Sequence, residues 1–119
     1  MTDPHSVFQA LRSAMLAHAK GLQRAADQDD HLYINTLHIQ KNKKPLFFGS
    51  VQVKKGGVSY HLMPLYTHPE LLNDVSAALK KKMSGKSCFN IAASDEALIK
   101  ELAALTKAAY QTYKKAGYV

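Results

Sequence analysis

The spacing of the apolar residues changes twice along this chain, and this pattern restricts the fold more than any other feature. Near the N-terminus they recur at steps of three and four residues, which predicts a helix that Asp3 and Pro4 open. The polar run Asp27–Asp30 is expected to end it. In the middle of the chain the step becomes two, as in strands, and near the C-terminus the helical step returns. The first helical stripe consists of Phe8, Leu11, Met15, Ala19, Leu22 and Ala26.

The central region predicts three strands in an antiparallel meander. Leu32–Ile39, Phe47–Lys54 and Val58–Met63 are rich in β-branched and aromatic residues, and the pair Gly56-Gly57 is typical of a tight turn between two strands. Strict alternation assigns the second strand two faces. One face is predicted to carry Phe47, Val51 and Val53, and the other Phe48, Ser50 and Gln52.

The remaining third of the chain predicts two helices and a strand. A helix is expected from Pro69 through the Lys80–Lys82 run to a stop at Gly85, followed by a strand at Ser87–Ala92. Ser94 is expected to cap the last helix. The order α-β-β-β-α-β-α over residues 1–119 predicts one α+β domain with two layers, in which helices cover one face of a four-stranded, mainly antiparallel sheet. Its predicted core contains Phe8, Leu11, Met15, Leu98, Leu102 and Leu105, packed on Val51, Val53 and Phe47.

Basic residues are in excess. The chain has 16 lysines and arginines against 9 acidic residues, and 14 of the 16 are lysines, so it should attract polyanions without reading their sequence. The lysines cluster, and Tyr33 and Phe48 are the candidate aromatic residues for stacking with bases. Non-specific nucleic-acid association is therefore one alternative function. The clusters are Lys41, Lys43 and Lys44; Lys54 and Lys55; and Lys80–Lys82 with Lys86.

Several classes of protein are disfavoured by the sequence. The N-terminus lacks the basic and apolar segments of a signal peptide, and no apolar run is long enough to cross a bilayer. The lone Cys88 cannot form an internal disulfide. These features predict a cytoplasmic protein that is not bound to membranes.

No motif of a known catalytic or cofactor site occurs, so we expect no cofactor and rank an enzyme last. The six histidines never form a ligand-like pair on one short element. Cys88 lies in a predicted strand beside Phe89, and packing is the favoured role for its side chain over that of a nucleophile, although Lys86 is close in sequence.

His61 is the best candidate for a binding residue. If Tyr60 points into the core with Val58 and Leu62, His61 must lie on the opposite face of the sheet. There a small ligand, an anion among others, or a protein partner would meet His61, Ser59, Ser50 and Gln52. The competing interpretation is a solvated sheet face without a ligand. Whether Cys88 and Asn90 share this face is left open by the sequence.

The stretches FFGSVQVKKGGVSYHLMPLY, PELL and GKSCFNI, which precede a long terminal helix, resemble the YdhG-like domain family of small, mostly uncharacterised bacterial proteins. The resemblance covers about residues 46–118. It implies a two-layer α+β fold and no established enzyme activity. Because some members are described as frataxin-like iron chaperones, it also implies a weak iron carrier as an alternative function, with Asp27, Asp29 and Asp30 as the metal ligands.

Overall fold

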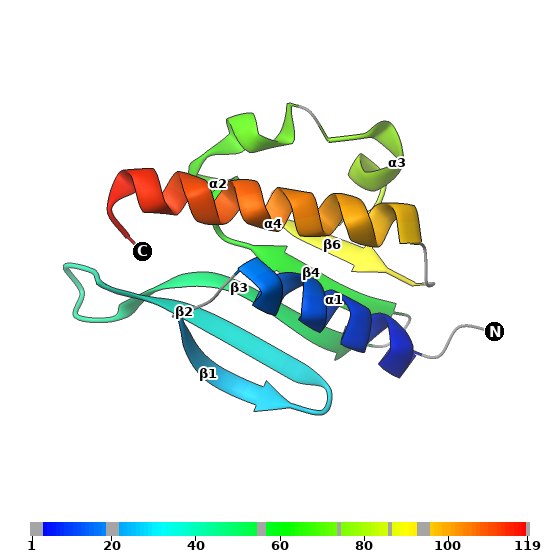
Figure 1. Ribbon diagram of the computed structural model, residues 1–119, viewed down its shortest axis with the longest axis horizontal. Helices are drawn as coiled ribbons and strands as arrows, with labels where there is room; N and C mark the ends of the chain where they lie inside the picture. The colour runs from blue at the N-terminus through cyan, green and yellow to red at the C-terminus, as the bar shows by residue number, and fades with distance from the viewer. Residues whose placement is uncertain are drawn as a thin grey trace.

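The structure is a computed structural model that describes residues 4–18, 22–54, 57–73, 75–85, 87–92 and 96–118. It is an α+β fold in which helices pack against an antiparallel sheet, as the sequence predicts (Figure 1). Some residues used in the sequence analysis lie outside the described part of the chain, namely Asp3, Ala19, Lys55, Gly56, Lys86 and Ser94.

The sheet is larger than predicted. Within the described residues it has six strands in the order β1-β2-β3-β4-β6-β5, not four, and every neighbouring pair is antiparallel. The two additional strands, β1 and β5, lie at the edges. β1 has the sequence QRAADQ and is mostly exposed, so it carries none of the apolar alternation that identifies a strand. The strands are β1 (Gln23–Gln28), β2 (His31–Ile39), β3 (Pro45–Lys54), β4 (Gly57–Leu62), β5 (Met83–Ser84) and β6 (Cys88–Ile91).

Two predicted helices are wrong in extent. The first one ends at His18 instead of continuing to Ala26, because Ala26 belongs to β1 and pairs with β2. The second one is broken into a 3₁₀ turn and a separate short helix, whose N-terminus is capped by the Ser76 hydroxyl accepting a hydrogen bond from the Leu79 N–H at 3.1 Å. The helices are α1 (Pro4–His18), α2 (Pro64–Thr67), the 3₁₀ helix η1 (Pro69–Leu72), α3 (Ala77–Lys80) and α4 (Glu96–Ala116).

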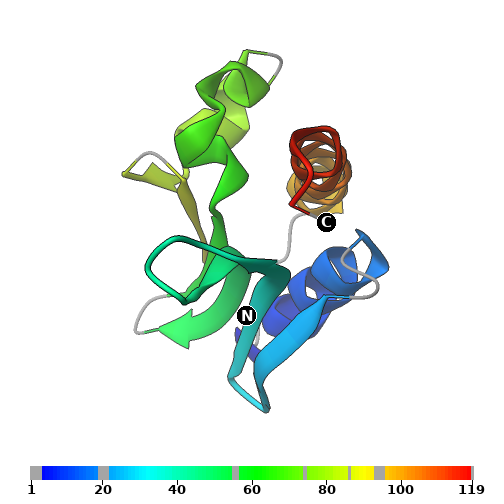
Figure 2. The same ribbon diagram turned by 90° about the vertical axis from the view of Figure 1, so that its left-hand side faces the viewer.

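The terminal helices α1 and α4 lie side by side on the same face of the sheet (Figure 2), as predicted. They bury an apolar core against the strands, and the Tyr60 hydroxyl on β4 forms a hydrogen bond with Thr106 on α4. Val53 and Phe47, which were predicted to be buried, are only half-buried. The predicted core residues that are buried are Phe8, Leu11, Met15, Val51, Leu98, Leu102 and Leu105.

A β-bulge in β3 explains why the predicted faces of this strand are wrong for its two phenylalanines. Ile34 pairs with Gly49, but the next residue of β2, Asn35, pairs with Phe47, so Phe48 is an extra residue. Phe48 is fully buried, whereas Phe47 shares the opposite face with Tyr33, and their rings stack 4.6 Å apart. The bulge therefore exchanges the two phenylalanines between the faces of the sheet.

Substitution of Leu102 tests the packing of α4 in the core. Its side chain is completely buried in the middle of α4. We expect Leu102→Ala to lower the free energy of unfolding by about 2–5 kcal/mol, because it removes apolar contacts and leaves a cavity. Urea denaturation measures this change. Lys100→Ala, at an exposed position of the same helix, is the control and should change stability by no more than about 0.5 kcal/mol.

Gly49 tests the close approach of α1 to the sheet. A Cβ atom added there would lie 2.6 Å from the His61 carbonyl oxygen and 2.8 Å from the Met15 methyl group. Because the oxygen belongs to the backbone, the strands must shift to make room, and we expect Gly49→Ala to cost about 1–3 kcal/mol of stability. Gln52→Ala, on the exposed side of the same strand, should cost clearly less; equal losses would argue against this packing.

Candidate functional site

The face of the sheet that points away from α1 and α4, here called the open face, carries polar and aromatic side chains. Strand pairing aligns them in two rows across β2, β3, β4 and β6. All four predicted site residues, Ser50, Gln52, Ser59 and His61, fall in these rows. Cys88 and Asn90, whose face the sequence left open, join them. The first row is His31, Gln52, Ser59 and Asn90, and the second is Tyr33, Ser50, His61 and Cys88.

His61 lies at the centre of the open face and is half-buried. Its Nε2 atom is 2.7 Å from the hydroxyl oxygen of Ser87, and its ring meets the ring of Phe47 edge-to-face at 5.0 Å. Burial lowers the pKa of His61 below its ordinary value of 6.5, and the positive charge of Lys54 lowers it further. The ring is therefore neutral at pH 7 and acts there as a hydrogen-bonding group.

Cys88 pairs with His61 on the neighbouring strand and lies on the open face, half-buried, instead of in the helix-covered core. Burial raises the pKa of its thiol, while the charge of Lys54 and a hydrogen bond with Ser59 act in the opposite direction. A raised pKa keeps the sulfur protonated at neutral pH. This environment does not provide the thiolate that a cysteine nucleophile needs.

Four rings form a continuous aromatic row across β2, β3 and β4. The His31 and Tyr33 rings are 6.1 Å apart, the Tyr33 and Phe47 rings stack at 4.6 Å, and Phe47 leads to His61 at 5.0 Å. Of the two residues predicted for base stacking, Tyr33 belongs to this row and Phe48 does not. Phe48 instead packs in the core against Tyr110 and Tyr113. No signal in the sequence identified the bulge that causes this exchange.

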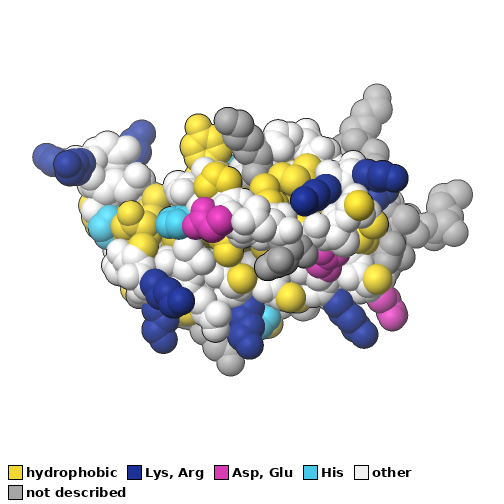
Figure 3. Space-filling model, turned by 90° about the horizontal axis from the view of Figure 1, so that it is seen from above, with side chains coloured by type: hydrophobic (Ala, Val, Ile, Leu, Met, Phe, Trp, Pro, Cys, Tyr) yellow, Lys and Arg dark blue, Asp and Glu magenta, His cyan; other side chains and the backbone are white. Residues whose placement is uncertain are grey.

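Strands β2, β3 and β4 and the β2–β3 hairpin carry basic side chains but no acidic ones. The sequence contains no aspartate or glutamate between Asp30 and Glu70, so β2, β3 and β4 contribute no carboxylate side chain. Lys54 influences both His61 and Cys88. A second basic group, Lys41, Lys43 and Lys44, is exposed at the tip of the β2–β3 hairpin, the projection at the left of Figure 3 where dark blue side chains gather.

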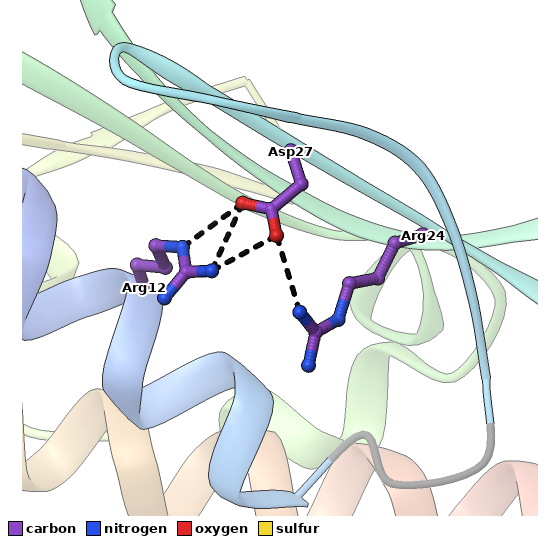
Figure 4. A network of polar contacts seen from close by, with 3 residues as sticks. All are labelled: Arg12, Arg24 and Asp27. Carbon is purple, nitrogen blue, oxygen red and sulfur yellow. Dashed lines mark hydrogen bonds and ion pairs between the residues drawn. The ribbon is translucent and has the colours of Figure 1, made fainter.

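Of the three predicted metal ligands, Asp27 is bound to two arginines and the other two lie in a turn. Asp27 lies at the end of β1 and accepts hydrogen bonds from Arg12 at 2.9 to 3.1 Å and from Arg24 at 3.1 Å (Figure 4). These arginines lower the pKa of the Asp27 carboxyl group, with Arg12 as the main cause. Asp29 and Asp30 form the turn between β1 and β2. Among the described residues no group of three or more possible ligands is close enough to hold a metal ion, so the iron-carrier hypothesis gains no geometric support.

Three hollows of the surface involve other residues. One, of about 430 Å³, lies beside the β2–β3 hairpin, where the His38 ring packs 4.7 Å from that of Tyr118. A second, of about 270 Å³, lies between α1 and α4 and includes His18, Lys107 and Lys114. The third, of about 260 Å³, adjoins Glu70 and Glu101. None of the predicted site residues lines these three hollows.

The chain matches no protein-family model, no curated protein and no solved structure. None of the described helices has the length and apolar character needed to cross a membrane.

The lowered pKa of His61 makes stability depend on pH. In the unfolded chain the ring binds a proton with a pKa near 6.5, whereas in the folded protein it binds that proton less readily. The free energy of unfolding should therefore fall as the pH decreases below about 6.5. Urea denaturation at several pH values should give a shallower dependence for His61→Gln. Gln52→Ala removes no titrating group from the same face and should keep the wild-type dependence; a His61→Gln curve parallel to wild type would contradict this assignment.

Proposed function

We propose that this chain is a small binding domain that holds an anionic ligand on its open face, with His61 at the centre of the site. The observation that supports the proposal most is the composition of this face. A histidine, hydroxyl groups and amide groups lie together beside Lys54, on strands β2, β3 and β4, which carry no carboxylate side chain.

Each predicted residue has a role in this proposal. The hydroxyl groups of Ser50 and Ser59 and the amide of Gln52 donate hydrogen bonds to an anion. Lys54 supplies the positive charge. His61 becomes a second cation when the ligand is bound, because a nearby negative charge favours its protonated form.

We further propose that the domain belongs to the YdhG-like family and is cytoplasmic. Many of the residues that carry the family resemblance lie in β3, β4 and β6, three of the four strands that build the open face. The resemblance implies no established enzyme activity, and the raised pKa of the Cys88 thiol agrees with a binding role.

NMR titration of the His61 ring between roughly pH 5 and 8, with and without inorganic phosphate, tests the proposal. Phosphate bound beside His61 should raise the pKa of the ring. The signals of His68, which lies between α2 and η1, serve as the control and should not respond to phosphate. A His61 titration curve that phosphate leaves unchanged would refute the proposed anion site.

A further inference from the structure

We propose that the ligand of the open face is a single-stranded nucleic acid, whose bases stack on the aromatic row formed by His31, Tyr33, Phe47 and His61. The inference rests on the proposed function, because it assigns a ligand class to the same face. The two proposals depend on different side chains. The anion site depends on polar and charged side chains, whereas base stacking depends on the aromatic rings.

The aromatic row lies on an accessible face of the sheet. It crosses three neighbouring strands on the side of the sheet away from α1 and α4, and its four rings are half-buried, so each keeps exposed surface. Sheet faces with aromatic side chains bind unpaired bases in this way, because every base has a flat face that can stack. The bases of a duplex are already stacked on each other, so the row favours single strands.

The surrounding groups match the rest of a nucleic-acid strand. Lys54 lies on the open face, and the lysines of the β2–β3 hairpin tip lie on an extension of the strands that carry Tyr33 and Phe47. These cations attract phosphate groups, and strands β2, β3 and β4 carry no acidic side chain. Beside the rings, Gln52, Ser59 and Asn90 offer hydrogen bonds to base edges.

Fluorescence anisotropy with labelled oligonucleotides tests the inference on the full chain. The probes are a strand of about 12 thymidines, an abasic strand of the same length, and a duplex that contains the thymidine strand. We expect the thymidine strand to bind at least about fivefold more tightly than the abasic strand, because only the former can stack. It should also bind more tightly than the duplex, and its affinity should decrease as salt is added.

Variants of the row separate stacking from charge. Phe47→Leu and Tyr33→Leu keep an apolar side chain but remove the flat ring, and each should weaken thymidine binding by roughly 5- to 140-fold, the range that corresponds to the loss of one stacked base. Binding of the abasic strand should not change. The matched control is Tyr66→Leu, because Tyr66 is 59% exposed on α2, away from the row, and its loss should leave both affinities unchanged.

The ring signals of Tyr33 and Phe47 in the wild-type NMR spectrum give a second measurement that needs no variant, and they should shift when the thymidine strand is added.

Equal affinity for the thymidine and abasic strands would overturn the inference. So would binding that survives Phe47→Leu and Tyr33→Leu. If either result is found while phosphate still raises the pKa of His61, the anion site stands and only the ligand class is wrong. If phosphate also has no effect, both proposals fail.

Discussion

One extra residue in β3, Phe48, determines what each face of the sheet presents. On the Lys54 side of the bulge, the side chains of β2 and β3 alternate between the faces in the same register. Leu32 is therefore opposite Val51 in the core, and His31 is opposite Gln52 on the open face. The bulge reverses this alternation. Phe48 consequently enters the core against rings of α4, and Phe47 joins Tyr33 on the outside. Both the packing of α4 and the continuity of the aromatic row depend on this local irregularity.

The predictable parts of this fold are those in which the sequence period is unbroken. From Ser50 to Leu62 the alternation runs without interruption on both sides of the β3–β4 turn, so the shared face of Ser50, Gln52, Ser59 and His61 could be inferred correctly. The apolar stripe of α4 likewise identified its buried side. The sequence did not predict the elements whose conformation depends on tertiary pairing and not on the local residue pattern. β1 is polar and forms because β2 offers it backbone partners, and the bulge depends on side-chain packing that no short window of sequence contains.

The open face has few charges of its own. Partial burial lowers the pKa of His61 and raises the pKa of Cys88, so it favours the neutral form of both, and Lys54 is the charged group that acts on both. On the other side of β4, Tyr60 is buried and linked to Thr106 of α4, and burial raises the pKa of its hydroxyl. One side of β4 thus packs in the apolar core. The other side carries His61, whose protonation can respond to a ligand bound on the open face.

The polar strand β1 also affects how the protein behaves at high concentration. Without it, the edge of the sheet would be β2, a strand of nine residues with buried Leu32 and Ile34, and such an edge can pair with other copies of the chain. β1 replaces that edge with charged and amide side chains. The ion pair between Arg12 and Asp27 attaches β1 to α1, although the two residues are 15 positions apart in the chain. This ion pair therefore helps to keep the protein from aggregating through its own sheet.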